Sequence, residues 1–170
     1  MRKVEVVPHN LQWKSNFDTE SQYITNALGE NAIAIHHIGS TAIATIYAKP
    51  IIDFLVEVKS INQVDDRNLE MESIGYEVMG EFGIKDRRFF RKDNQLGIRT
   101  HHIHIFEINS AQITRHLAFR DYMLAHPEAA QEYSNLKRKL AAEYPNDIAG
   151  YQAGKAEFIK EIDRADGFGS

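Results

Sequence analysis

Residues 36–58, HHIGSTAIATIYAKPIIDFLVEV, contain the residue types that phosphate and metal chemistry use. Gly39 lets a backbone turn come close to a ligand, and Ser40 or Thr41 can donate a hydroxyl hydrogen bond to it. Asp53 follows inside an apolar run, although aspartate is disfavoured in strands. The segment therefore predicts a site in which Gly39, Ser40 and Thr41 bind phosphate and Asp53 binds a cation.

A second candidate group lies in the segment RTHHIHIFE, residues 99–107. His102 and His104 are two residues apart, so in a strand they lie on one face, about 7 Å apart at their backbones. Imidazoles at such positions can converge on one ion. If this strand lies beside the strand of Asp53, two nitrogens and one oxygen become available. We therefore predict Asp53, His102 and His104 as metal ligands.

Basic side chains could complete a phosphate site. Lys49 lies in the loop that enters the aspartate-bearing strand, and Lys155 lies one helical turn after Tyr151, so both could face one ligand. Arg88 belongs to an arginine-rich stretch, and arginine suits bidentate phosphate contacts. Lys49, Arg88, Tyr151 and Lys155 are therefore predicted to bind a nucleotide.

The elements that must position these residues follow from hydrophobic spacing. Residues 92–95 form a polar turn that predicts an antiparallel hairpin. The order of the expected helices and strands along the chain predicts an α+β fold, with a mixed central sheet of about five strands flanked by helices. Strands are expected at 32–38, 51–58, 76–79, 87–91 and 98–107, and helices at 13–28 and 60–74, from Ser110, from Pro127, and at 151–162.

Alternation along 51–58 separates two faces of the strand. Asp53, Leu55 and Glu57 share one face, because side chains alternate with period two. Asp53 and Glu57 are four residues apart, about 13 Å at about 3.3 Å per residue, so both cannot coordinate the same ion. Leu55 occupies the position where a second metal-binding carboxylate would best fit.

Composition limits the class of protein. With 170 residues and 43% hydrophobic content, the chain is long enough for one domain, which we expect to span residues 1–170. The net charge of −4 gives no overall attraction to nucleic acid or an anionic membrane, so neither is predicted as a partner. Without cysteine, a long apolar stretch or a signal-peptide core, a cytoplasmic location is expected.

Three stretches resemble the GrpB family, which is grouped with the polymerase-beta-like nucleotidyltransferase superfamily: HIGSTAIATIYAKPIIDFLVEV, RTHHIHIFE and AHPEAAQEYSNLKRKLA. The resemblance covers nearly the whole chain and implies a nucleotidyltransferase-like fold. The superfamily pattern places Gly-Ser at the end of the first strand and Asp-x-Asp or Asp-x-Glu on the second. Gly39, Ser40 and Asp53 match this pattern, whereas Leu55 departs from it. The resemblance implies Asp53 and Ser40 as catalytic residues.

The implied activity is transfer of a nucleotidyl group from a nucleoside triphosphate to an unknown small acceptor. The implied cofactor is a divalent metal, either magnesium or manganese. Because Leu55 cannot ligate, His102 and His104 would have to complete the site, and their nitrogens would favour manganese or zinc over magnesium. Two alternatives stay open. One is a metal-dependent phosphohydrolase with a histidine and aspartate site, and the other is a noncatalytic nucleotide-binding or interaction module.

Overall fold

The computed structural model describes residues 4–165, and this part of the chain forms two compact units. Residues 11–38 and 51–114 form the first, which we call the sheet unit. Residues 4–10, 39–50 and 115–165 form the second, which we call the helical unit. The expectation of a single domain over residues 1–170 stays a prediction.

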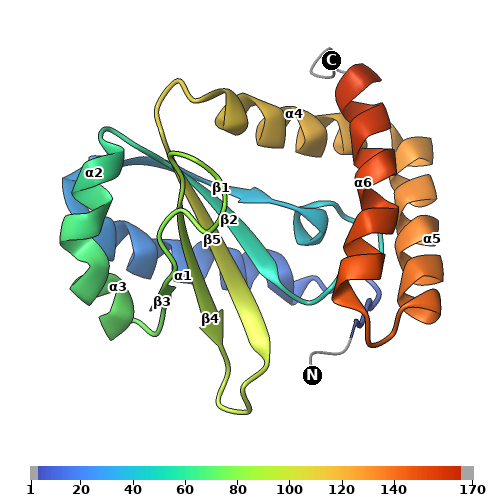
Figure 1. Ribbon diagram of the computed structural model, residues 1–170, viewed down its shortest axis with the longest axis horizontal. Helices are drawn as coiled ribbons and strands as arrows, with labels where there is room; N and C mark the ends of the chain where they lie inside the picture. Colours follow the sequence, from blue (N-terminus) through green and yellow to red (C-terminus); the bar gives the residue numbers. More distant parts are fainter. Residues whose placement is uncertain (1–3, 166–170) are drawn as a thin grey trace. The chain divides into compact units, whose positions relative to one another are not determined.

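A five-stranded mixed sheet organises the sheet unit (Figure 1), in the order β1-β2-β5-β4-β3. β2 runs parallel to β5, while the β1–β2, β4–β5 and β3–β4 pairs are antiparallel. The five predicted strands, the hairpin and the α+β fold are confirmed, but the turn predicted at residues 92–95 lies at residues 94–98, because the ladder between the hairpin strands continues through Asp93. In chain order the strands are β1 (Ala32–Ile38), β2 (Ile52–Val58), β3 (Glu77–Val78), β4 (Arg88–Asp93) and β5 (Arg99–Glu107).

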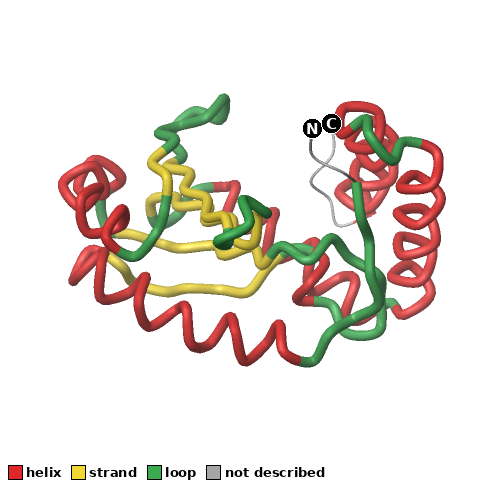
Figure 2. Tube along the Cα trace, turned by 90° about the horizontal axis from the view of Figure 1, so that it is seen from below, coloured by secondary structure: helices red, strands yellow, loops and turns green. Residues whose placement is uncertain are grey.

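One face of the sheet carries the core of this unit. α1 (Gln12–Leu28) packs on β1 and β2, and Figure 2 shows a helix along this face. Phe17 of α1 stacks on Phe54 of β2, with ring centroids 5.0 Å apart. Ile24 and Leu28, one turn apart on α1, are fully buried, as its helical spacing predicts. β2 is therefore anchored by its apolar face, which leaves Asp53 on the other.

The continuous helix predicted over residues 60–74 is wrong. The chain forms two short helices, α2 (Ile61–Val64) and α3 (Asn68–Ser73), joined by a 3₁₀ turn at Asp65–Arg67. Asp65 in this turn pairs with Arg88 of β4, at 2.8 Å between Oδ1 and Nε. A long-range ion pair and a tighter turn thus replace the continuous α-helix.

Three longer helices follow β5. α5 and α6 lie side by side, and Pro127 occupies the first turn of α5, as predicted. The main apolar cluster of the helical unit joins Ile43 and Ile46 to Met123, Tyr133 and Ile162. No helix within residues 4–165 is long and apolar enough to cross a membrane. The helices are α4 (Ala111–Ala125), which begins in the sheet unit, α5 (Pro127–Glu143) and α6 (Ile148–Ala165).

Candidate functional site

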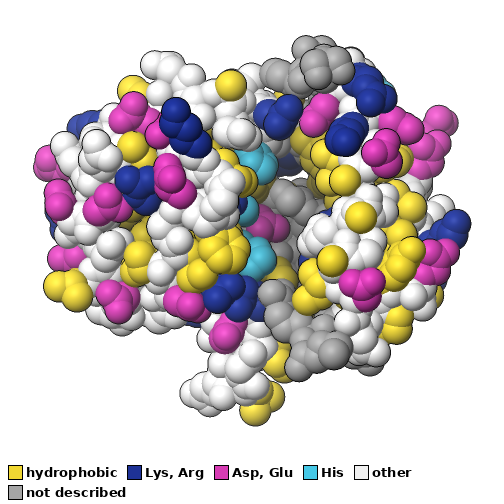
Figure 3. All heavy atoms as spheres, viewed as in Figure 1, with side chains coloured by type: hydrophobic (Ala, Val, Ile, Leu, Met, Phe, Trp, Pro, Cys, Tyr) yellow, Lys and Arg dark blue, Asp and Glu magenta, His cyan; other side chains and the backbone are white. Residues whose placement is uncertain are grey.

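The sheet register brings the predicted aspartate and histidines together. Asp53 of β2 is paired with His102 of β5, and Leu55 with His104, so all four side chains lie on one face. This confirms the expected adjacency of the two strands. The side chains of Asp53, His102 and His104 keep 25%, 22% and 16% of their surface exposed, and Figure 3 shows histidines reaching the molecular surface.

Both imidazoles point at the same carboxylate oxygen. His104 Nε2 lies 3.4 Å from Asp53 Oδ1, and His102 Nδ1 lies 3.5 Å from the same atom. The two rings are nearly perpendicular, with centroids 6.5 Å apart. The ring of Phe89 packs against both, at centroid distances of 5.3 and 5.2 Å. The result is a compact group that we call the Asp53 cluster: Asp53, His102, His104 and Phe89.

Two arginines contact the far side of these histidines. The Arg87 guanidinium donates to His104 Nδ1 at 3.2 Å, and Arg99 donates to His102 Nε2 at 3.5 Å. Arg87 is buried and also donates to two backbone carbonyls. The contacts of Arg87 and Arg99 with the histidines were not predicted, because they depend on the path of the loop before β4 and on the irregular register of β4 with β5.

The Asp53 carboxyl group is held in its charged form. Burial alone would raise its pKa, but the hydrogen bonds that it accepts from His102 and His104 outweigh burial and hold that pKa well below its usual value. Asp53 is therefore a carboxylate at neutral pH, the form in which an aspartate binds a cation.

The fit of this cluster to a metal is partial. One carboxylate and two imidazoles are a plausible donor set for a divalent cation. Within residues 4–165, however, no group of three or more His, Cys, Asp or Glu side chains is arranged to hold a metal ion. The ring nitrogens lie at hydrogen-bonding distance from Asp53. Asp53 thus fits a cation, and ligation by His102 and His104 stays a prediction.

Glu57 belongs to a separate pair on the same face. Its Oε2 lies 2.6 Å from Nε2 of His36 on the neighbouring strand β1. This agrees with the expectation that Glu57 and Asp53 do not share an ion. Leu55, between them, is fully buried, so the second carboxylate position of the superfamily pattern is an apolar core position here.

The Gly-Ser turn lies at the end of the first strand, as predicted. Gly39 directly follows Ile38, the β1 residue that pairs with Asp53. Its φ of 72° favours glycine, and Ser40–Ala42 then form a 3₁₀ turn. Thr41 is buried and Ser40 is partly exposed. Gly39, Ser40 and Thr41 belong to the helical unit, whereas Asp53 belongs to the sheet unit.

A basic and aromatic group lies within the helical unit. Lys49 Nζ and Lys155 Nζ each lie 5.1 Å from the ring centroid of Tyr151, so these three predicted residues meet. Lys137, which the sequence analysis did not single out, lies with its Nζ 4.6 Å from the ring of Tyr133. We call these residues the lysine cluster: Lys49, Lys137, Lys155, Tyr133 and Tyr151.

Lys137 is the most unusual member of the lysine cluster. Its side chain is 1% exposed, and Nζ has no hydrogen-bond partner in the described part of the chain. The Tyr151 hydroxyl likewise has none among residues 4–165. Burial, and then the charges of Lys155 and Lys49, lower the pKa of Lys137 to about 7. Such a group is suited to receive an anion, which would supply the missing acceptors.

A signal for Lys137 was present in the sequence. Tyr133, Leu136 and Leu140 form the apolar stripe of α5, and Lys137 stands within that stripe at helical spacing. Lysine is almost never fully buried without a functional or structural partner. A charged residue inside an apolar stripe could therefore have been selected from the sequence.

Arg88 lies elsewhere than the other predicted site residues. It is paired with Ile105, whose side chain lies on the face of β5 opposite to His104. Its guanidinium makes two contacts with Asp65, at 2.8 and 3.2 Å. The predicted nucleotide contact of Arg88 stays a prediction.

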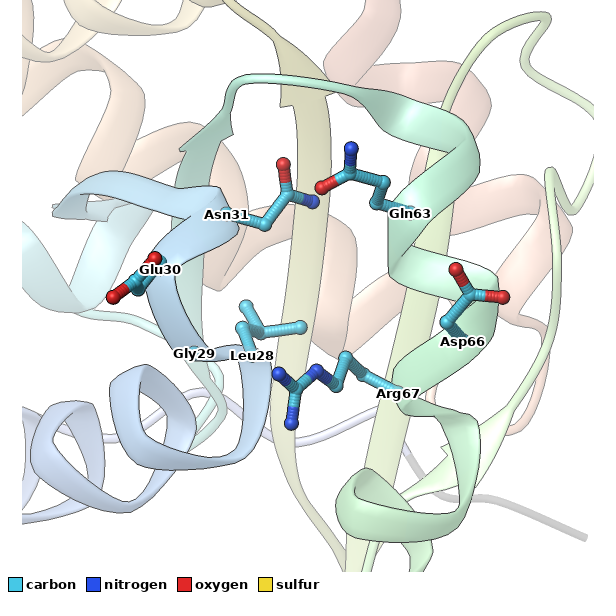
Figure 4. Close-up of a pocket in the computed structure, with 7 residues that line it drawn as sticks. All are labelled: Leu28, Gly29, Glu30, Asn31, Gln63, Asp66 and Arg67. Carbon is cyan, nitrogen blue, oxygen red and sulfur yellow. The ribbon is translucent and has the colours of Figure 1, made fainter.

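A separate pocket of about 590 Å³ opens between α1 and the 3₁₀ turn before α3 (Figure 4). The Arg67 guanidinium extends toward Leu28 and Gly29 there, and the Asn31 amide is already bonded to the backbone of Ser60. None of the predicted site residues lines it. The lining residues are Leu28, Gly29, Glu30, Asn31, Gln63, Asp66 and Arg67.

Curated proteins of similar sequence include the UPF0157 protein YqkA of Bacillus subtilis, which is 48% identical over 94% of this chain. The chain spans about half of that protein, 46% of its length. The glutamate-rich protein GrpB of Alkalihalophilus pseudofirmus is 38% identical, and the match covers 94% of both chains.

Solved structures give a consistent result. The conserved protein GrpB from Enterococcus faecalis superimposes with a TM-score of 0.90 at 44% identity, covering 95% of this chain and 96% of that one. Cid1 in complex with its short product ApU gives 0.55 at 11% identity, covering 86% and 48%. At this identity the likeness to Cid1 shows the fold alone, which is nucleotidyltransferase-like.

A family model described as GrpB protein matches residues 3–165, nearly the whole chain. The strand-end Gly-Ser turn and the Asp53 cluster lie inside this match. The chain therefore belongs to the GrpB family.

Proposed function

We propose that this chain binds a nucleoside triphosphate and a divalent cation, and transfers a nucleotidyl group to a small acceptor. The observation that carries the proposal is the Asp53 cluster, in which one strand carboxylate is held ionised beside hydrogen-bond donors. Cid1, which shares the fold, has been seen with MgGTP bound. The cation proposed here is magnesium or manganese, because a carboxylate is a hard oxygen ligand.

Each residue has a defined part in this proposal. Asp53 holds the cation. Gly39 lets the backbone come close to phosphate, because its φ of 72° is accessible without strain only to glycine, and Ser40 and Thr41 supply hydroxyl donors. A divalent cation bound at Asp53 would offset negative charge that develops during in-line displacement at phosphorus.

Within the helical unit taken by itself, we propose that the lysine cluster binds phosphate. Lys49 and Lys155 flank the ring of Tyr151 on α6, and Lys137 lies buried on the neighbouring helix α5. Phosphate oxygens would give Lys137 Nζ the acceptors that residues 4–165 do not. Bound anion would also raise the pKa of Lys137 and favour its charged form.

A second candidate function is metal-dependent hydrolysis of a phosphorylated small molecule. The two imidazoles beside Asp53 favour it, because histidine can move a proton near neutral pH. The third, a noncatalytic nucleotide-binding module, is favoured by Leu55, since this buried apolar residue occupies the position of the second carboxylate in the superfamily pattern.

The first test is ligand-dependent thermal stability of metal-stripped protein. We expect a nucleoside triphosphate with magnesium or manganese to raise the Tm, because a ligand that binds only the folded state stabilises it, by about 2.7 kcal/mol at 100 times its Kd. Asp53→Asn should abolish the part of the shift that requires metal. Glu57→Gln is the matched control, since it makes the same chemical change on the same face of β2.

Product analysis separates the three candidate functions. A transferase should release pyrophosphate only when an acceptor is added, and a hydrolase should release phosphate without one. A binding module should do neither while still being stabilised. An Asp53→Asn protein that keeps the full metal-dependent Tm shift would contradict the proposed cation site.

A further inference from the structure

We propose that His102 and His104 are positioning residues that orient Asp53 by donating hydrogen bonds to it, and that Arg87 and Arg99 select the required tautomer of each ring. This inference rests on the proposed role of Asp53 in cation binding. It differs from the sequence-based expectation, in which both histidines are themselves metal ligands.

The contact with Arg87 determines the tautomer of His104. A guanidinium has only donors and stays protonated in proteins, so the ring nitrogen that it contacts must be the acceptor. Arg87 contacts Nδ1 of His104 at 3.2 Å, which makes Nδ1 the unprotonated nitrogen. In a neutral imidazole the other nitrogen then carries the hydrogen. That nitrogen, Nε2, is the one 3.4 Å from Asp53 Oδ1.

His102 repeats this arrangement with its two nitrogens exchanged. Arg99 contacts Nε2 of His102 at 3.5 Å, so Nε2 is the acceptor and Nδ1 carries the hydrogen. Nδ1 lies 3.5 Å from Asp53 Oδ1. Two arginine–histidine pairs therefore converge on one oxygen of one carboxylate, and each uses a different ring nitrogen.

In both rings, the nitrogen that faces Asp53 is the donor, whereas in a metal-binding histidine the nitrogen that faces the ion offers a lone pair. A histidine that ligates a metal gives a lone pair to the ion and donates its other N–H to a carboxylate or carbonyl. Here the outer nitrogens of His102 and His104 accept from arginines, and the inner nitrogens point N–H groups at Asp53. In this state neither ring offers a lone pair toward an ion at Asp53.

The rings are held by more than these four contacts. Phe89 packs on both imidazoles, and the Arg87 guanidinium lies 4.7 Å from the ring of Phe89. Arg87 also donates to the backbone oxygens of Glu81 and Phe82, which fixes it in the loop before β4. Partners anchored in this way orient a carboxylate, as the outer-shell groups of metal sites do.

Nitrogen-15 NMR of the histidine side chains in the metal-free wild-type protein, near pH 8, tests the inference directly. Protonated and unprotonated ring nitrogens have distinct shifts, so the tautomer of each ring can be read. We expect hydrogen on Nε2 of His104 and on Nδ1 of His102. The opposite tautomer at either ring, or a doubly protonated ring, would overturn the inference.

Variants at the arginines extend this test. Arg87→Met should lower the share of His104 rings that carry hydrogen on Nε2, because Asp53 alone then favours that tautomer, while an apolar chain remains to pack on Phe89. Arg88→Gln is the control on β4, since the Arg88 side chain lies on the opposite face of the sheet and pairs with Asp65. An unchanged single tautomer in Arg87→Met would contradict the assigned part of Arg87.

Conservative substitutions of His102 and His104 show whether these residues orient Asp53 or bind the metal themselves. A glutamine amide can place N–H near Nε2, and an asparagine amide can place it near Nδ1, so His104→Gln and His102→Asn can still donate to Asp53. We expect these variants to retain manganese affinity in titration calorimetry, and His104→Leu to bind about 10- to 100-fold more weakly, the usual cost of losing an outer-shell partner. Equal loss in His104→Gln and His104→Leu would overturn the positioning role.

Failure of this inference can be told apart from failure of the proposed function. Reversed tautomers together with manganese binding that requires Asp53 would overturn the positioning role alone. Absence of any cation binding by wild-type protein would overturn the proposed function, and the positioning role with it.

Discussion

Lys137 places an ionisable group in an apolar environment at a free-energy cost that depends on pH. Its pKa falls from an ordinary 10.5 to about 7, chiefly because of burial. Between these values the unfolded chain binds the proton and the folded chain has released it. The free energy of unfolding must therefore rise with pH in this window, by up to about 1.4 kcal/mol per pH unit for one proton.

We expect Lys137→Met to remove this rise. Below about pH 7 both states of the wild type carry the proton, so the destabilising contribution of Lys137 is then at its maximum and constant. Urea denaturation of both proteins from pH 6.5 to 10 measures the difference in slope. Lys139→Met, at an exposed position of the same helix, should behave like wild type. Parallel curves for wild type and Lys137→Met would contradict the assigned pKa.

The residues of the Asp53 cluster differ in how far the sequence predicts them. Asp53, His102 and His104 could be predicted, because strand alternation decides which side chains share a face. Arg87 and Arg99 could not be assigned to the histidines, since this needs the register of β4 with β5 and the path of the loop before β4. The spacing of residues within one strand does not indicate which residues of the neighbouring strand lie beside them.

At the scale of elements, the packing of α5 against α6 depends on a small residue. A Cβ atom added to Gly154 of α6 would lie 2.4 Å from Cδ2 of Leu140 on α5. Leu140 is itself buried beside Tyr151 and Val4, so it has little room to move. A larger residue at position 154 would therefore force the side chain of Leu140 out of its place between the two helices.

We expect Gly154→Val to destabilise the protein by about 1–3 kcal/mol, the usual cost of forcing methyl groups into a packed contact. Chemical denaturation followed by circular dichroism measures this change. Ala153→Val, at the neighbouring exposed position, is the control and should cost only the difference in helix propensity, about 0.5 kcal/mol. Equal losses for the two variants would show that the helix contact is looser than described.

The elements themselves were predicted unevenly. β1 has the bounds that its apolar pattern indicates, residues 32–38, because a strand of this kind is decided by its own side chains. The break at Asp65–Arg67 was missed, since it involves an ion pair to Arg88, 23 residues further along the chain. A contact between residues this far apart in the chain cannot be read from the local helical pattern.

At the scale of the whole molecule, the two units are interleaved in the chain. Ile43 and Ile46, between β1 and β2, pack with Met123 and Ile162 from α4 and α6. Length and composition indicate how much core the chain can build, but not that residues 39–50 join the C-terminal helices. That arrangement depends on contacts between residues about 80 or more positions apart, which local patterns do not encode.

Residues 4–10 belong to the helical unit, which allows a test of whether the units unfold together. Val4 is 5% exposed, packs with Leu140 and Tyr151, and its N–H donates to the Pro145 carbonyl. Val4→Ala should therefore cost about 2 kcal/mol through lost burial and a residual cavity. Leu11→Ala, at a position that is 84% exposed, should cost little.

Hydrogen exchange followed by mass spectrometry distinguishes the two outcomes. If the units open separately, Val4→Ala should lower protection in residues 39–50 and 136–151 while the strands β1, β2 and β5 keep theirs, since local opening follows cooperative units. Ligand binding by the lysine cluster should then weaken before the sheet unit is affected. An equal loss of protection in both units would instead establish one cooperative domain, which is what the chain length predicts.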